Sequence, residues 1–357
     1  MEAIPDIFKI ERKNDVIEKE FNSFTVYLKK FSSNNQKYLL PDDQNIAENN
    51  EFFYYLIKPR KIDRINDVVI ISHGLNEQRY QKMLPWALEL VKNNFAVIIF
   101  PMAFHINRRP KEWSIKGSFN KRVSERLTEN PKRFYLGGLQ SYFDVMSLVK
   151  KIKLIEKEDF YEDLFSEDTK VHFLGYSASG YLVLILHLIN QDNLFSDSKS
   201  VLFCSGASVD FIDPATIYIM SKEASESLFN FYKSYSMGDT EFNKLYNTEI
   251  GFWFKNIFLN TDNEKLEEKL NELGKNILVI ANSNDKIIKA EGIKRNLKGL
   301  RIIELGLGIH EFPFNNIGYE EDYESAVSAI RNNIGTIHFN KEFNDFIQST
   351  AKFLRGD

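Results

Sequence analysis

Residues 170–189 combine a short apolar strand, a tight turn and a helix that is apolar on nearly every side. The turn reads GYSASG over residues 175–180, so that small residues surround Ser177. A helix without a polar face has to be covered all round, which requires a large layered core. The sequence therefore predicts a strand that turns sharply into a buried helix, with the Ser177 hydroxyl at the positive end of the helix dipole.

Other apolar segments are continuous rather than alternating, for example VVII at 68–71 and AVIIF at 96–100. This pattern is typical of parallel strands that are covered on both faces. Helical spacing of apolar residues separates them, so we predict an α/β fold with a mostly parallel central sheet flanked by helices. The predicted strands are an antiparallel pair, Phe24–Phe31 and Phe52–Lys58, followed by Asp67–Ser72, Phe95–Pro101, Lys170–Gly175, Lys199–Ser205, Asn276–Ala281 and Arg301–Leu305. Predicted helices include Tyr80–Val91, Leu139–Ile152 and Phe339–Leu354.

Composition restricts the class of protein. The chain has 357 residues, 43% of them hydrophobic, which suits one large domain with insertions. A net charge of −4 gives no reason to expect nucleic acid as a partner. The single cysteine, Cys204, lies in an apolar run and is expected to be a buried structural thiol. No signal-peptide core and no apolar run long enough to span a membrane are present, so we expect a cytoplasmic protein.

Two segments exceed what a minimal sheet needs. Residues 102–136 follow a strand end and form a basic insertion, and residues 207–274 separate two strands. We predict a helical cap over 207–260, inserted in a core formed by 1–206 and 261–357. A helix over 263–273 returns to the core, with capping-box spacing at Thr261 and Glu264.

A serine hydroxyl needs a general base within hydrogen-bond reach, and that base needs an orienting acid. Asp285 follows the predicted strand Asn276–Ala281, and His310 follows the strand Arg301–Leu305. Carboxyl ends of parallel strands meet at one edge of a sheet. Asp285 and His310 are therefore expected on neighbouring loops beside Ser177.

These residues resemble the serine hydrolases of the α/β-hydrolase superfamily, in which the order along the chain is serine, acid, histidine. The resemblance covers about residues 24–355. It implies that Ser177 is the nucleophile, His310 the general base and then acid, and Asp285 the orienting carboxylate. It also maps two oxyanion-hole N–H groups onto Leu75, after the His-Gly pair at 73–74, and onto Ala178.

Alternatives remain open at this point. Asp210 follows another strand and is a rival for the orienting acid. His73 is interpreted as a support of the oxyanion loop, and His172 and His187 as packing residues. The fifth residue of the turn is usually glycine in this superfamily and is Ser179 here, so an inactive member of the superfamily is a second interpretation.

The insertions bear on the substrate. Residues 106–133 carry nine Lys or Arg and three Glu. Either this is a solvated loop, or residues such as Arg108 and Arg109 bind an anionic substrate. The predicted cap is rich in aromatic residues, which fits an apolar pocket.

We expect a hydrolase without cofactor or metal that cleaves a small-molecule carboxylic ester or related acyl compound through an acyl-enzyme. A peptidase, a thioesterase or an inactive ligand-binding protein are the alternatives. The sequence does not predict the oligomeric state.

Overall fold

The core of the protein is a nine-stranded sheet. The computed structural model describes residues 15–80, 82–114, 119–216, 219–234, 240–311, 313–314 and 341–356. The strand order is β1-β2-β3-β5-β4-β6-β7-β8-β9. The strands β1, β2 and β3 pair antiparallel, β3 pairs antiparallel with β5, and the remaining neighbours are parallel. The strands are β1 (Val16–Glu20), β2 (Phe24–Ser32), β3 (Glu51–Pro59), β4 (Ile65–Ser72), β5 (Ala96–Ile99), β6 (Phe165–Tyr176), β7 (Ser200–Phe203), β8 (Ile277–Asn282) and β9 (Arg301–Leu305).

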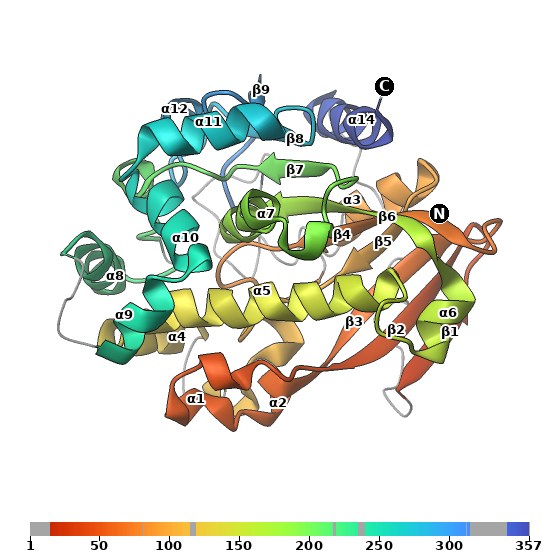
Figure 1. Cartoon of the computed structure of the whole chain (residues 1–357), viewed down its shortest axis with the longest axis horizontal. Helices are drawn as coiled ribbons and strands as arrows, with labels where there is room; N and C mark the ends of the chain where they lie inside the picture. Colours follow the sequence, from red (N-terminus) through yellow and green to blue (C-terminus); the bar gives the residue numbers. More distant parts are fainter. Residues whose placement is uncertain are drawn as a thin grey trace.

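Helices cover both faces of the sheet (Figure 1). Side chains of α5 and α7 pack into the core on one face, and those of α3 and α14 pack on the other. The helices are α1 (Pro41–Gln44), α2 (Ala47–Asn50), α3 (Leu84–Lys92), α4 (Phe119–Glu129), α5 (Lys132–Ile152), α6 (Asp159–Leu164), α7 (Ala178–Ile189), α8 (Lys222–Ser234), α9 (Thr240–Tyr246), α10 (Glu249–Leu259), α11 (Asn263–Leu273), α12 (Ala290–Asn296) and α14 (Lys341–Arg355).

This mixed α/β architecture, with a mostly parallel sheet flanked by helices, confirms the predicted fold class. Each predicted strand is present within a few residues of its predicted bounds. The edge strand β1 was not predicted, because its sequence VIEKE is short and charged, as exposed edge strands commonly are. The start of the C-terminal helix at Phe339 falls outside the described residues. Among the helices that the structure describes, none has the length and apolar character needed to cross a bilayer.

The described part of residues 207–260 includes α8, α9 and α10, which lie together at one end of α5 and close to α4 in Figure 1. The helix α10 packs against α7, and α8 packs against α4. The helix α11 follows and begins after Asp262, whose side chain accepts a hydrogen bond from the Lys265 N–H. The predicted cap at Thr261 was wrong by one residue, because the Thr261 hydroxyl donates to the Asn256 side chain instead. That α8–α10 act as a cap over the site stays a prediction.

Candidate active site

Ser177 lies at the turn between β6 and α7, at the carboxyl edge of the parallel strands. Its backbone has φ 55° and ψ −121°, a sparsely populated combination for a residue with a side chain. The Ser177 N–H donates to the Phe203 carbonyl at 2.9 Å, which fixes the turn against the end of β7. Ser177 is 6% exposed. The chain therefore holds this serine in a strained conformation that lifts its side chain off the sheet edge.

Ser179 stands where the pattern quoted above usually has glycine, and the turn still forms. Its hydroxyl accepts from the Tyr176 N–H at 2.9 Å and donates to the Tyr176 carbonyl at 3.0 Å. The next residue, Gly180, supplies the close approach: a Cβ there would lie 2.4 Å from the Ser205 Cβ. Glycine is thus needed one position later than in the usual pattern, and Ser179 ties the end of β6 to the first turn of α7.

His310 joins Ser177 to Asp285. Its Nε2 lies 2.9 Å from the Ser177 Oγ, and its Nδ1 lies 2.7 Å from the Asp285 Oδ2. All three side chains are buried. Because the carboxylate only accepts, Nδ1 carries a proton and Nε2 is free to accept from the serine hydroxyl. The structure therefore brings together the three residues that the sequence singled out from separate loops, in an arrangement able to take a proton from Ser177.

Asp285 is fixed by the loop after β8. Its Oδ1 accepts from the Ile287 and Ile288 N–H groups at 2.8 and 2.9 Å, which leaves Oδ2 for His310. The rival Asp210 lies elsewhere: it is exposed and forms an ion pair with Lys233 at 2.7 Å. Asp285, not Asp210, is thus the carboxylate in contact with the histidine.

The loop after β4 packs directly on the serine. A Cβ added to Gly74 would lie 3.2 Å from the Ser177 Cβ, so the backbone just before Leu75 comes close to Ser177. His73 is fully buried, which lowers its pKa to about 4 and keeps it neutral. Its Nδ1–H donates to the Gly74 carbonyl at 2.8 Å, and its Nε2 accepts from the Met102 N–H at 3.0 Å. His73 therefore fixes the shape of the loop after β4, in agreement with its interpretation as a residue that supports this loop.

The other two histidines singled out are buried but also hydrogen-bonded. His172 Nδ1 accepts from the Lys199 N–H at 3.0 Å, so its Nε2–H faces Asp67 at 3.2 Å. His187 Nε2 lies 2.6 Å from the Ser200 hydroxyl, and burial lowers its pKa to about 4. Both join strands or helices far from Ser177, in agreement with packing roles.

Residues 213–216 and 219–220, here called the strap, touch two loops of the site, and sequence reasoning missed this. The Asn76 side-chain amide, in the loop after β4, donates to the Ile219 carbonyl. The Thr216 hydroxyl donates to the buried Glu311 carboxylate at 3.1 Å, next to His310. Neither Asn76 nor Glu311 belongs to a recognisable motif, so only the structure reveals that the strap links the two loops.

Cys204 is buried beside the same residues. Its sulfur and one ligand atom each of Asp285 and His310 lie within 4.8 Å of one another, and they form the one potential metal-ligand group within the described parts of the chain. Burial, followed by the Asp285 charge, raises the pKa of the Cys204 thiol well above its ordinary value. A cysteine binds a metal ion through its thiolate form, not as a protonated thiol. We therefore interpret Cys204 as a protonated thiol packed behind Asp285, and the expectation of no metal or cofactor stays a prediction.

The expected substrate contact by Arg108 was wrong. Arg108 is fully buried, and its guanidinium donates to the Asp144 carboxylate at 2.7 Å and to Asn49 and the Pro101 carbonyl. Asp144 also accepts from the side chains of Ser33 and Asn35 at 2.6 and 2.7 Å. Arg108 thus joins the insertion to α5 and to the N-terminal strands. A sequence pattern of basic residues does not distinguish such an internal ion pair from a surface cation.

Asp144→Ala is expected to lower the free energy of unfolding by about 3–5 kcal/mol, because it leaves the Arg108 charge buried without its partner. Urea unfolding followed by circular dichroism measures this loss. Glu129→Ala is the matched control, since Glu129 is an exposed partner of Arg133 and its loss is expected to cost only about 0–1 kcal/mol. Equal unfolding midpoints for the two variants would contradict the assigned role of the internal pair.

Four further arginines of the basic insertion have partners within the protein. Arg126 and Arg133 both contact Asp43, and Arg122 contacts Glu125. Arg109 donates to the Gln78 side chain, in the loop after β4, at 3.0 Å. A substrate contact by Arg109 stays a prediction.

Comparison with known proteins agrees with this architecture. Among solved structures, the chain is similar to esterase Est22 with p-nitrophenol, at 13% identity and a TM-score of 0.51, over 94% of this chain and 82% of that one. The Pyrococcus furiosus esterase Pf2001 is similar over 98% of both chains, at 13% identity and a TM-score of 0.47. The likeness to Est22 shows a shared fold. No curated protein matches the sequence.

A family model does match nearly the whole chain, over residues 6–121 and 117–355. Its description is a family of unknown function, DUF6051. The matched range includes β4, β6, β8 and β9, whose following loops carry Leu75, Ser177, Asp285 and His310. The chain therefore belongs to the DUF6051 family.

Proposed function

We propose that this protein is a serine hydrolase that cleaves carboxylic esters or related acyl compounds through an acyl-enzyme. The observation that carries the proposal is the continuous hydrogen-bonded series Ser177 Oγ, His310 Nε2, His310 Nδ1 and Asp285 Oδ2, at 2.9 and 2.7 Å. Its position at the end of a strained strand-to-helix turn, in a fold shared with an esterase, supports the same function.

In the proposed reaction the Ser177 oxygen attacks the ester carbonyl carbon while its proton passes to His310 Nε2. Asp285 accepts from Nδ1–H and stabilises the positive charge that forms on the ring. The carbonyl oxygen becomes negative in the tetrahedral intermediate, where the N–H groups of Leu75 and Ala178 are the proposed donors. The Ala178 N–H lies in the first turn of α7, where N–H groups lack a partner within the helix.

The intermediate collapses when the C–O bond to the leaving alcohol breaks and His310 Nε2 gives its proton to that oxygen. A water molecule then attacks the acyl-enzyme, with His310 as base, and releases the acid and free Ser177. His310 carries the proton in each step, and the ester and one water molecule are the only reactants.

The test is hydrolysis of p-nitrophenyl butanoate, measured by stopped flow. We expect an initial burst of p-nitrophenol that approaches one molecule per protein, followed by slower turnover, as an acyl-enzyme predicts. Matched butanoyl thioesters and amides, assayed in parallel, separate an esterase from a thioesterase or peptidase. Release of p-nitrophenol no faster than in buffer would favour a ligand-binding protein.

A further inference from the structure

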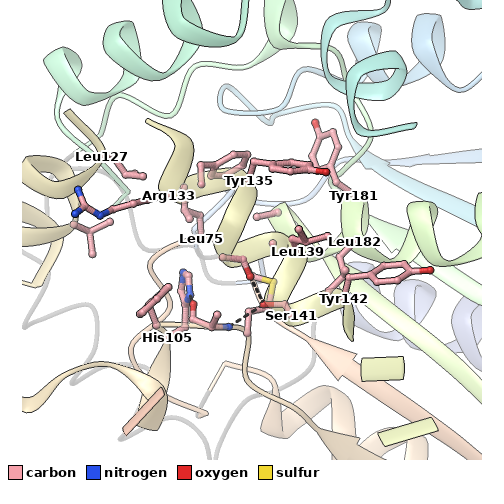
Figure 2. Close-up of a pocket in the computed structure, with 18 of the residues that line it drawn as sticks. Leu75, His105, Leu127, Arg133, Tyr135, Leu139, Ser141, Tyr142, Tyr181 and Leu182 are labelled. Carbon is pink, nitrogen blue, oxygen red and sulfur yellow. Dashed lines mark hydrogen bonds between the residues drawn. The ribbon is translucent and has the colours of Figure 1, made fainter. Parts of the chain in front are cut away.

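A cavity of ≈ 140 Å³, open in part to solvent, begins beside the proposed oxyanion donors. Leu75 and Ala178 both line it. Figure 2 shows Leu127 and Arg133 on one side of this space and Tyr142 and Leu182 on the other. Its walls come from the loop after β5 and from α4, α5, α7 and α10, and aromatic rings make up much of them: Phe104, Trp113, Phe134, Tyr135, Tyr142, Tyr181 and Phe254.

Most charged and polar groups of this cavity have partners within the protein, although the buried atoms Asn76 Oδ1, His105 Nε2 and Tyr142 Oη accept or donate no hydrogen bond among the described residues. Asp43 contacts both Arg126 and Arg133, so these three charges partly cancel. The Ser141 hydroxyl donates to the Gly137 carbonyl at 2.8 Å and accepts from the Ala103 N–H at 2.9 Å. His105 is kept neutral, because burial lowers its pKa to about 3. The cavity therefore offers mainly apolar surface to a ligand.

The position of His310 decides which half of an ester enters this cavity. The leaving alcohol has to lie beside His310, because Nε2 gives it a proton. Leu75 and Ala178 line the cavity. The described residues of the two loops that carry Asp285 and His310 do not line it. With the carbonyl oxygen at the Leu75 and Ala178 N–H groups, the group that points into the cavity is the acyl group.

We propose that this cavity is the acyl-binding site and that it selects esters of bulky, neutral, apolar acids over acetyl esters. The inference rests on the proposed function of Ser177. At roughly 10–15 Å³ for each water-sized group, the cavity holds about ten such groups, which is several times what an acetyl group fills. Each further methylene buried from water is expected to raise kcat/KM by up to roughly fourfold until the space is filled.

Gly138 on α5 offers a way to test this. It lines the cavity, and a Cβ built there meets nothing within 4 Å, so the first atom of an added side chain has open space around it. Gly138→Ala and Gly138→Leu reduce the space in two steps. Glycine is also a poor residue for a helix interior, so the melting temperature is not expected to fall. Ser147→Leu is the matched control, because it adds the same side chain on the same helix at a half-buried position that does not line the cavity.

The experiment measures kcat/KM for p-nitrophenyl acetate, butanoate, hexanoate and octanoate, all below their micelle concentrations, and for the p-nitrophenyl monoester of octanedioic acid. With one leaving group throughout, only the acyl group varies. We expect octanoate to exceed acetate by at least a hundredfold and the carboxylate-terminated ester by at least tenfold. The octanoate-to-acetate ratio is expected to fall at least tenfold in Gly138→Leu, by less in Gly138→Ala, and to stay at the wild-type value in Ser147→Leu.

The two ways to fail are distinguishable. If acetate is hydrolysed as well as or better than octanoate, or if Gly138→Leu keeps the wild-type ratio, the assignment of the cavity is overturned while the hydrolase function stands. A preference for the carboxylate-terminated ester would likewise overturn it and favour an anionic acyl group bound by Arg126 and Arg133. If no ester is hydrolysed, the proposed function itself fails and the inference with it.

Discussion

Alanine in place of Ser177 is expected to lower kcat for ester hydrolysis by roughly 10⁶-fold, because the variant has no oxygen to form the acyl-enzyme. The rate that remains comes from substrate binding and the oxyanion donors, which act without the nucleophile. His310→Ala is expected to cost about as much, since the two groups act as one unit. Steady-state assays with p-nitrophenyl butanoate at high protein concentration measure both.

The folding control for this prediction comes from the strained backbone. Ser177 has φ 55° and ψ −121°, which a glycine adopts with less strain. Ser177→Gly is therefore expected to be inactive and at least as stable as the wild type in thermal melts. Such a gain would indicate that the strain is retained for reactivity. Activity near the wild-type level in Ser177→Ala or Ser177→Gly would contradict the assignment of the nucleophile.

Asp285→Asn is expected to lower kcat by roughly 10⁴-fold with little change in the fold. The reason lies in the two backbone N–H groups, of Ile287 and Ile288, that donate to Oδ1. They require an oxygen at that position, so the asparagine side chain has to turn its NH₂ group toward His310 Nδ1. The histidine then carries its proton on Nε2, where it can no longer accept from Ser177.

Asp210→Asn is the matched control for this prediction. Asp210 is the other carboxylate that follows a strand of the sheet, but it is exposed and pairs with Lys233. The kcat of the Asp210→Asn variant is expected to stay within about twofold of the wild-type value. A loss of activity in Asp210→Asn, with Asp285→Asn active, would overturn the choice of acid.

The sequence contained enough to place Ser177, Asp285 and His310 near one another. Each follows an apolar strand, and parallel register aligns the ends of β6, β7, β8 and β9 at one edge. The same reasoning located most of the sheet. It did not find β1, because a short charged edge strand lacks the apolar pattern of a buried strand.

Contacts between distant segments were beyond the reach of sequence patterns. In the sequence, Arg108 is one of many basic residues in an insertion. In the structure it is buried, because the carboxylate of Asp144, 36 residues later on α5, neutralises its charge. The links from the strap to Asn76 and Glu311 depend on side chains that no motif marks. The cavity, too, is formed by helices that meet only in the folded chain, and the open space at Gly138 has no sequence signature.

Covalent labelling by a fluorophosphonate tests the central claim most directly, because this reagent reacts with a serine only when its oxygen is activated as a nucleophile. Mass spectrometry of digested protein locates the adduct. The account predicts one adduct, on Ser177, that disappears in Ser177→Ala and is strongly slowed in His310→Ala. Labelling on another residue, or none under conditions that label a control serine hydrolase, would contradict the proposal that Ser177 is an activated nucleophile.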